Sequence, residues 1–220
     1  AGMAPTYDPD QATGANGISI AILPPDKTNF NFGFRGTNNI SGALVLDMNA
    51  SGTKDSGEPP VQGVMVVLED GSGNVIRTTA TNASGIYQFN NLPTGTFAIR
   101  VNALPFSGET LANHHLPDGL IATFDPDGIA TLNRASVTLT TNQNIIDRDF
   151  GYRGDGRIGD LVWIDYNANG TQDSSEPGIN GANVAITWTG TGFLPGTYTF
   201  SPIATNSSGG YLLSNLPPGS

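Results

Sequence analysis

Residues 40–68 read ISGALVLDMNASGTKDSGEPPVQGVMVVL, and residues 158–186 read IGDLVWIDYNANGTQDSSEPGINGANVAI. The two stretches align without a gap at an offset of 118 residues. In each one, an alternating apolar segment leads into a loop rich in Asp, Asn and Gly, and a second apolar segment follows. Apolar alternation with period two is typical of a half-buried β-strand, and clusters of Asn, Asp and Gly are typical of turns. Each stretch therefore predicts a strand, a loop and a second strand.

Further matches extend this repeat in both directions. Residues 81–96 (TNASGIYQFNNLPTGT) match residues 205–220 (TNSSGGYLLSNLPPGS), and residues 31–36 (NFGFRG) match residues 149–154 (DFGYRG). Self-similarity at a fixed period is the signature of a repeat architecture. We therefore divide the chain into residues 1–37 as the C-terminal part of one repeat, residues 38–153 as a complete repeat, and residues 154–220 as the N-terminal part of a further repeat.

The third piece differs from the complete repeat in one place. Its offset rises from 118 to 124, so that six extra residues lie around residues 188–202. Both ends of the chain fall inside a repeat. We expect that the sequence is a window on a longer array. The alternative is that the two ends complement each other between neighbouring molecules by strand addition.

The complete repeat contains seven segments with strand character and none with a 3.6-residue apolar stripe. The predicted strands are residues 40–46, 64–69, 75–81, 85–89, 96–101, 135–140 and 145–152. This number of short strands separated by Gly, Asn and Pro turns is typical of a Greek-key sandwich. We predict an all-β protein made of tandem Greek-key β-sandwich domains of the Ig-like or prealbumin-like kind. The nearly absent linkers favour stiff end-to-end stacking over a flexible string.

Composition limits the partners. Nineteen acidic residues against nine basic ones give a net charge of −10, which argues against nucleic acid and anionic membranes as partners. No apolar run reaches the length of a membrane span. The chain has no cysteine, so its stability must come from a core or from a metal rather than from disulfides.

The loops at residues 47–58 and 165–176, which are related by the offset of 118, both fit the twelve-residue calcium pattern D-x-[DN]-x-[DNS]-G-x₅-E. Calcium takes six to eight oxygen ligands at about 2.3–2.6 Å, from positions 1, 3, 5, 7, 9 and 12 of such a loop. The predicted Ca²⁺ ligands of the first loop are Asp47, Asn49, Ser51, Thr53 (through its carbonyl), Asp55 and Glu58. Those of the second loop are Asp165, Asn167, Asn169, Thr171, Asp173 and Glu176.

A strand enters each loop where an EF-hand would have a helix. We therefore expect a static, structural ion rather than a sensor that opens a helix pair. Without a cation the three carboxylates of each loop would repel one another. Asp125 and Asp127, in the sequence DPDG, are compatible with a second cation site and equally with a type I turn.

The segment 158–186, followed by T-x-x-S-G-x-Y and L-P-P-G, resembles the B-type repeats of serine-aspartate repeat surface proteins, which are relatives of the collagen-adhesin B domains. This resemblance implies a bacterial cell-surface or extracellular array of β-sandwiches whose calcium stiffens a stalk. Some collagen-adhesin B domains form a Lys–Asn isopeptide bond. The only lysines here are Lys27 and Lys54, and Gln172 replaces Lys54 in the other loop, so we expect no such bond.

The alternatives to a stalk are an enzyme, an adhesin module and a filament subunit. Catalysis is not expected, because the only histidines, His114 and His115, are adjacent and would face opposite ways on an extended strand. An adhesin module would need an exposed aromatic platform. The extra residues of the third piece, with Trp188, Phe193 and Tyr198, are the candidate partner surface, whereas five other aromatics are predicted to be core: Phe89, Phe97, Phe150, Tyr152 and Trp163.

The third alternative is a filament subunit, which would assemble with copies of itself, whereas a stalk fragment would stay monomeric. Our sequence-based hypothesis is a calcium-stabilised structural repeat of an extracellular stalk, surface-layer or filament protein, with neighbouring repeats as partners. An adhesin module that binds a host protein or glycan is the alternative. The Asn-x-Ser sequences at Asn82 and Asn206 are expected to form turns.

Overall fold

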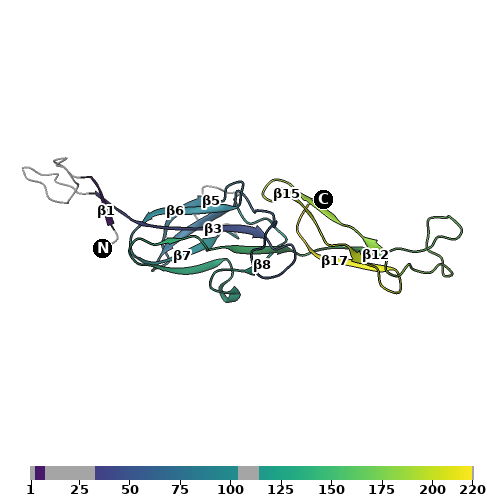
Figure 1. Cartoon of the computed structure of the whole chain (residues 1–220). Helices are drawn as coiled ribbons and strands as arrows, with labels where there is room; N and C mark the ends of the chain where they lie inside the picture. The colour runs from purple at the N-terminus through teal and green to yellow at the C-terminus, as the bar shows by residue number, and fades with distance from the viewer. Residues whose placement is uncertain (1–2, 8–32, 104–113, 220) are drawn as a thin grey trace, which may run out of the picture.

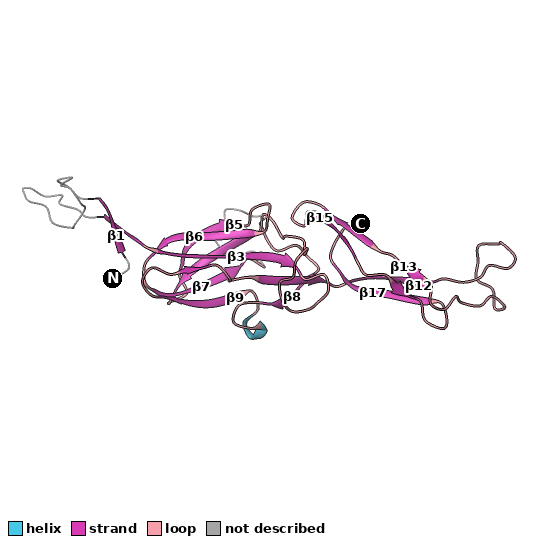
Figure 2. Cartoon of the chain, in the orientation of Figure 1, coloured by secondary structure: helices cyan, strands magenta, loops and turns pink. Residues whose placement is uncertain are grey.

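The computed structural model describes residues 3–7, 33–103 and 114–219. These residues form strands and turns, together with one 3₁₀ helix, η1 (Ile129–Thr131) (Figure 2). Within the described ranges no helix is long and apolar enough to cross a membrane. The prediction of an all-β protein is confirmed.

The complete repeat is a sandwich of two sheets (Figure 1). One sheet contains β6 (Ile86–Leu92), β3 (Asn38–Leu46), β10 (Asn144–Ile145), β11 (Phe150–Gly154) and β8 (Leu120–Phe124). The other has the order β5 (Val75–Ala80), β4 (Met65–Asp70), β7 (Gly95–Val101) and β9 (Arg134–Leu139).

Strand β3 lies inside the first sheet and determines its topology. It pairs antiparallel with β6, and parallel with both β10 (Asn144 beside Asn39) and β11 (Phe150 beside Leu44). Parallel neighbours require a long crossover connection, and here the crossover is almost the whole repeat. The first and last strands of the repeat are therefore hydrogen-bonded to each other.

The core lies between the two sheets, where the inward side chains of both sheets meet. Leu44, Val66 and Ile99 are fully buried. The predicted aromatic core residues Phe89, Phe97, Phe150 and Tyr152 are buried. Trp163 differs, because it is only half-buried.

Six of the seven predicted strands match observed strands, with bounds that shift by up to three residues. The predicted strand at residues 145–152 is two strands, β10 and β11. Between them the chain passes over Gly42, where a Cβ atom would overlap the carbonyl of Arg148. Asp149 Oδ1 accepts a hydrogen bond from the backbone of Ala43 at 2.7 Å, which takes the place of a ladder bond. Strand β8 was not predicted.

The flanking pieces reproduce parts of this fold. Strands β1 (Met3–Tyr7) and β2 (Gly33–Gly36) pair as β8 and β11 do, with Met3 beside Gly36 where Leu120 lies beside Gly154. After Asp155 come β12 (Gly156–Leu161), β13 (Asn183–Val184), β14 (Thr187–Gly190), β15 (Gly196–Thr199), β16 (Ile203–Ala204) and β17 (Gly210–Leu216). The pair β12–β17 repeats β3–β6, and β13–β16 repeats β4–β5. The pieces follow one another end to end (Figure 1).

Candidate metal sites and the junction between repeats

Both predicted calcium loops leave the end of an equivalent strand and are closed at the base in the same way. The first loop follows β3, and an isolated bridge joins Val45 to Pro60 across its base. The second loop follows β12, and the bridge joins Trp163 to Gly178. The two loops therefore have the same entry and exit.

The first carboxylate of each loop holds the turn. Asp47 accepts hydrogen bonds from the backbone N–H groups of Ser51 and Gly52, at 2.9 and 3.0 Å. Asp165 does the same for Asn169 and Gly170, at 3.2 and 2.9 Å. These bonds fold positions 1 to 6 of each loop into one compact turn.

The side chains at positions 3, 5 and 9 meet at one carboxylate oxygen. In the first loop, Asp55 Oδ2 lies 2.9 Å from Asn49 Nδ2 and 2.8 Å from Ser51 Oγ. In the second loop, Asp173 Oδ2 lies 2.7 Å from Asn167 Nδ2 and 3.0 Å from Asn169 Nδ2. Position 7 joins the first cluster, because the Thr53 carbonyl accepts from Ser51 Oγ at 3.2 Å. Hydrogen bonds from Asn49 and Ser51 lower the pKa of Asp55.

The glutamate at position 12 turns back to the loop. Glu58 Oε2 accepts from the backbone of Asp55 at 3.0 Å, as Glu176 Oε2 does from Asp173 at 3.0 Å. Glu58 Oε1 is buried and has no hydrogen-bond partner within the described part of the chain, whereas Glu176 Oε1 in the second loop accepts from the backbone of Tyr166 at 2.9 Å. Burial, and then the charges of Asp47 and Asp55, raise the pKa of Glu58 to about 7. A cation at this place would satisfy the orphan oxygen and offset the charge repulsion.

The donor set of these loops fits a hard cation. Every predicted ligand atom is an oxygen, from carboxylate, amide, hydroxyl or main-chain carbonyl, which suits Ca²⁺ and not a thiol- or imidazole-binding metal. Among the described residues no three Asp, Glu or His side chains are gathered closely enough to hold an ion by themselves. The neutral oxygens would therefore have to complete the coordination shell.

One feature of the loops was not predicted from the sequence. Ala50 and Ala168, at position 4, have left-handed backbones with φ of 54° and 57°. Position 6 was predicted to need glycine, and Gly52 and Gly170 both have φ of 75°. Only the structure reveals strain at an alanine, because alanine carries no turn signal.

The DPDG segment forms a turn. Asp125 Oδ1 accepts from the backbone of Asp127 at 3.2 Å, and the Asp125 carbonyl accepts from Gly128 at 3.2 Å. Asp127 Oδ2 accepts from the backbone of Ser136 at 2.9 Å. These bonds close the turn but leave Asp125 Oδ2 buried without a hydrogen-bond partner among the described residues, so the second cation site stays a prediction. Burial raises the pKa of Asp125 to about 6.

The first predicted calcium loop lies beside the next repeat. Met48 and Asn49 line a cavity of about 390 Å³ together with Tyr198, Phe200 and Leu212. Met48 is buried, with 3% of its surface exposed. A change in the conformation of this loop would therefore alter its contacts with the following repeat.

A second junction contact occurs twice in the chain. Gly154 packs so closely on Leu216 that a Cβ atom would overlap the Leu216 carbonyl, and Gly36 packs in the same way on Leu92. Beside these glycines, Arg153 donates to Asn215 Oδ1. The equivalent Arg35 donates to Asn91 Oδ1 at 2.9 Å. The matched FGFRG and FGYRG sequences thus join consecutive repeats in the same way.

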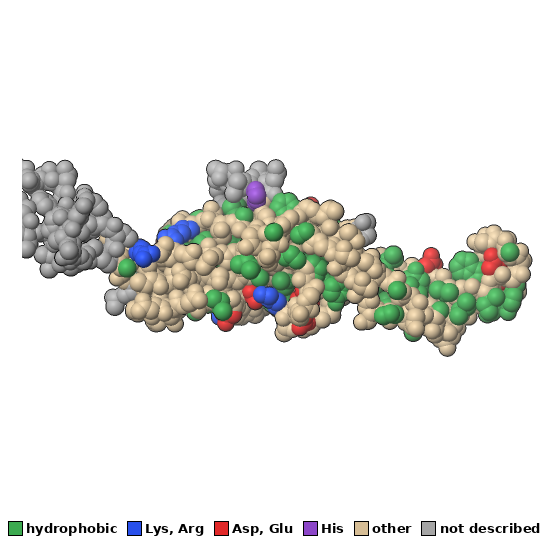
Figure 3. Space-filling model, turned by 45° about the horizontal axis from the view of Figure 1, so that its top comes forward, with side chains coloured by type: hydrophobic (Ala, Val, Ile, Leu, Met, Phe, Trp, Pro, Cys, Tyr) green, Lys and Arg blue, Asp and Glu red, His purple; other side chains and the backbone are tan. Residues whose placement is uncertain are grey.

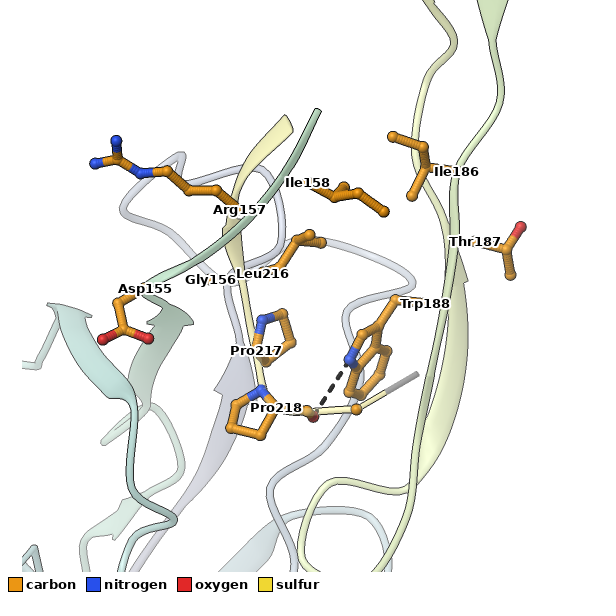
Figure 4. Close-up of a pocket in the computed structure, with 11 residues that line it drawn as sticks. Asp155, Gly156, Arg157, Ile158, Ile186, Thr187, Trp188, Leu216, Pro217 and Pro218 are labelled. Carbon is orange, nitrogen blue, oxygen red and sulfur yellow. Dashed lines mark hydrogen bonds between the residues drawn. The ribbon is translucent and has the colours of Figure 1, made fainter. Parts of the chain in front are cut away.

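The interior of the last piece is partly open. A cavity of about 400 Å³ lies between β12, β17 and β14, lined by Ile158, Ile186, Trp188 and Leu216 (Figure 4). In this view Trp188 Nε1 donates to the Pro218 carbonyl. Apolar side chains are also exposed over this piece (Figure 3), among them Ile158, Leu161, Ile164, Tyr166 and Leu212. In the complete repeat, Ile40 and Leu92 at the places of Ile158 and Leu216 are buried.

The aromatic residues of the six-residue insertion do not form a free surface. Trp188 is buried, with 4% of its surface exposed, and belongs to the core cluster. Phe193 lies against His114 with ring centroids 6.3 Å apart. Trp188 and Leu194 are thus part of the interior, Phe193 and Tyr198 are half-buried, and the tip residues Thr191 and Gly192 are exposed.

The remaining candidate residues have structural contacts. His114 Nδ1 lies 2.6 Å from the Gly63 carbonyl, and His115 Nδ1 lies 2.9 Å from Asn102 Nδ2. Lys54 Nζ lies 3.3 Å from Asp149 Oδ2, and Lys27 lies outside the described residues.

The two Asn-x-Ser sequences form equivalent turns. Asn82 Oδ1 accepts from the backbones of Ser84 and Ile86, and Asn206 Oδ1 accepts from those of Ser208 and Gly210.

Colossin-A from Dictyostelium discoideum is 31% identical over 96% of this chain, which spans 2% of that protein. Serine-aspartate repeat-containing protein F from Staphylococcus epidermidis is 33% identical over 80% of this chain, which spans 10% of that protein. A structural match to the shaft pilin SpaA from Lactobacillus rhamnosus GG covers 82% of each chain at 10% identity, with a TM-score of 0.37.

A family model gives the assignment. The model of the SdrD B-like domain matches residues 39–152 and again residues 156–220. The two matches meet at the junction of β11 and β12, and each begins at the strand that enters a predicted calcium loop. The chain belongs to the SdrD B-like domain family.

Proposed function

We propose that this chain is a calcium-stabilised structural repeat of an extracellular stalk, surface-layer or filament protein. The observation that carries the proposal is the pair of twelve-residue loops, which have the same ligand pattern and the same hydrogen-bond framework at the same place in two repeats. The orphan oxygen of Glu58 and its raised pKa support a cation there.

The role of the ion would be mechanical. It would hold the loop after the first strand of a repeat, next to the cavity where Met48 and Asn49 meet the following repeat. The family assignment supports an array of repeats, and the neighbouring repeat is then the principal partner. Adhesion to a host protein or glycan gains no support, because Trp188 and Phe193 are engaged within the chain.

Substitution of Glu58 by Gln tests the metal site, because it should change stability in opposite directions with and without calcium. Glutamine keeps an oxygen for the Asp55 N–H and removes a partly buried negative charge. In chelator, Glu58→Gln should therefore be as stable as the parent or slightly more stable. In calcium it should lose most of the stabilisation by the ion, about 2.7 kcal/mol at a free concentration of one hundred times Kd.

Glu69→Gln is the matched control. Glu69 is a buried glutamate that pairs with arginines and lies outside the loop, so its substitution should lower stability equally in calcium and in chelator. Thermal melts of the parent and of both variants, each in calcium and in chelator, measure these differences in stability. If Glu58→Gln gains as much from calcium as the parent does, this loop is not the metal site.

A further inference from the structure

The six extra residues of the last piece lengthen the hairpin β14–β15, and the tip of this hairpin lies on the preceding repeat. The strands pair from Thr187 beside Thr199 to Gly190 beside Gly196. At the tip, the backbone of Leu194 donates to the Thr191 carbonyl at 3.1 Å, which closes a tight turn. The hairpin is thus an ordered element built by the insertion.

Two hydrogen bonds from one residue of the complete repeat hold the tip. The backbone N–H of Gln62 donates to the Phe193 carbonyl at 2.8 Å. The Gln62 side-chain amide donates to the neighbouring Gly192 carbonyl at 2.6 Å. Bonds to two successive carbonyls fix both the position and the direction of the tip.

The Phe193 ring fills a place that the complete repeat leaves open for it. At Gly63, whose φ is 73°, a Cβ atom would lie 2.9 Å from Phe193 Cε1, so a side chain here would displace the ring. The His114 ring meets Phe193 edge-on, at an interplanar angle of 86°, and His114 is itself held on the Gly63 carbonyl. Next to the ring, Leu194 is buried with 4% of its surface exposed.

The complete repeat has no such hairpin. Its own β4 and β5 are joined by the short turn 70–74, which Asp70 Oδ1 closes by accepting from the backbones of Ser72 and Asn74 at 2.9 Å each. Residues 71–74 of this turn are exposed. The glycine and Arg–Asn contact is present at both junctions, whereas the hairpin contact is present at the second one alone within the described residues.

We infer that the β14–β15 hairpin is an inter-repeat clamp, which fixes the orientation of its own repeat on the preceding one by seating Phe193 on Gln62, Gly63 and His114. Repeats with the short turn are then joined by the glycine and Arg–Asn contacts without the hairpin, and their junctions bend more freely. Hairpin length would thus set the stiffness of each junction separately. The clamp uses no residue of the calcium loops and does not depend on the ion.

Distances between two spin labels in the full-length chain test this inference. The chain has no cysteine, so Ser72→Cys and Ser207→Cys place one label on an exposed position of each repeat. In chelator, the parent should give one narrow distance distribution. Gln62→Ala combined with Phe193→Ala should broaden it, because the side-chain hydrogen bond to Gly192 and the seated ring are lost. Ile146→Ala, which shortens an apolar side chain that is 66% exposed, should leave it narrow.

Each result is decisive. A parent distribution that is already broad in chelator, or a double variant as narrow as the parent, overturns the clamp. If Phe193→Ala unfolds the hairpin, Gln62→Ala alone decides, because it keeps the ring and removes only the side-chain bond to Gly192. A loop that fails to bind calcium leaves all these expectations unchanged, so this test is separate from that of the metal site.

Discussion

Ala50 and Ala168 are the residues at which the loops store backbone strain. A left-handed backbone costs an L-residue with a Cβ atom about 1–2 kcal/mol, and glycine avoids this cost. The strained conformation is stabilised by two hydrogen bonds in each loop. The carboxylate of Asp47 or Asp165 accepts them from backbone N–H groups at positions 5 and 6. Two repeats with the same strained residue at the same place indicate that the turn conformation is imposed by the whole loop.

Ala50→Gly should raise the free energy of unfolding by about 0.5–1 kcal/mol in calcium and in chelator alike, since relief of strain exceeds the entropy of the added glycine. Urea denaturation measures this change in the free energy of unfolding. Ala43→Gly, the same change in buried strand β3, should instead lower stability. A loss of stability in Ala50→Gly would show that the left-handed conformation carries no strain.

Glu69 is the other residue whose role the sequence did not reveal. It is buried, with 7% of its surface exposed, and bonds Arg100 at 2.7 Å and Arg134 at 3.1 Å across β4, β7 and β9. An alternating strand pattern indicates which face a residue occupies, but it does not indicate which charged residues three separate strands bring together. The twelve loop ligands could be predicted because their spacing lies within one local segment.

Glu69→Ala should lower the free energy of unfolding by about 2 kcal/mol, since charge-assisted hydrogen bonds to a buried carboxylate are lost. Asp147→Ala removes an ion pair whose carboxylate is 71% exposed, and it should cost less than about 0.5 kcal/mol. Chemical denaturation of both variants checks this difference. Equal losses of stability in the two variants would mean that the buried ion pairs of Glu69 stabilise the fold no more than the exposed pair of Asp147 does.

At the scale of elements, the sequence predicted the strands of the complete repeat better than their pairing. Alternation located the outer and central strands, but β8 is too short and too close to the DPDG turn to stand out. The parallel pairing of β3 with β10 and β11 joins residues about one hundred positions apart, and nothing local indicates it. The insertion was recognised from the shift in offset, but its place on the preceding repeat depends on Gln62 and Gly63, which carry no signal of a contact.

The glycine at the end of β11 is predicted to be essential for the junction. A Cβ atom in Gly154→Ala would overlap the carbonyl of Leu216, so that β11 and β17 must move apart, at a cost of about 1–3 kcal/mol. Thermal melts should show this loss, whereas the control Gly71→Ala, where the nearest atom to a new Cβ is 3.5 Å away, should be almost neutral. A neutral Gly154→Ala would mean that the close contact does not hold the junction.

At the scale of the molecule, the repeats form a row, and the junction between the complete repeat and the last piece combines three contacts of different kinds. The glycine contact recurs, the first predicted calcium loop borders the next repeat, and the β14–β15 hairpin reaches back to the preceding one. The net charge of −10 keeps such a row soluble and self-repelling, and a cation bound in each loop would reduce that repulsion. Stiffness would then depend on calcium in every repeat and on hairpin length at each junction.

The central claim is that calcium stabilises the folded repeat, and a thermal melt of the full chain at increasing free calcium, against excess chelator, tests it most directly. Because the ion would bind the folded loops and not the unfolded chain, stability should rise with the logarithm of free calcium, by about 2.7 kcal/mol at one hundred times Kd. Magnesium, which holds its water more firmly and demands a stricter geometry, should give a smaller rise. A melting temperature that is the same in millimolar calcium and in chelator would contradict the claim and leave both loops as turns closed by hydrogen bonds alone.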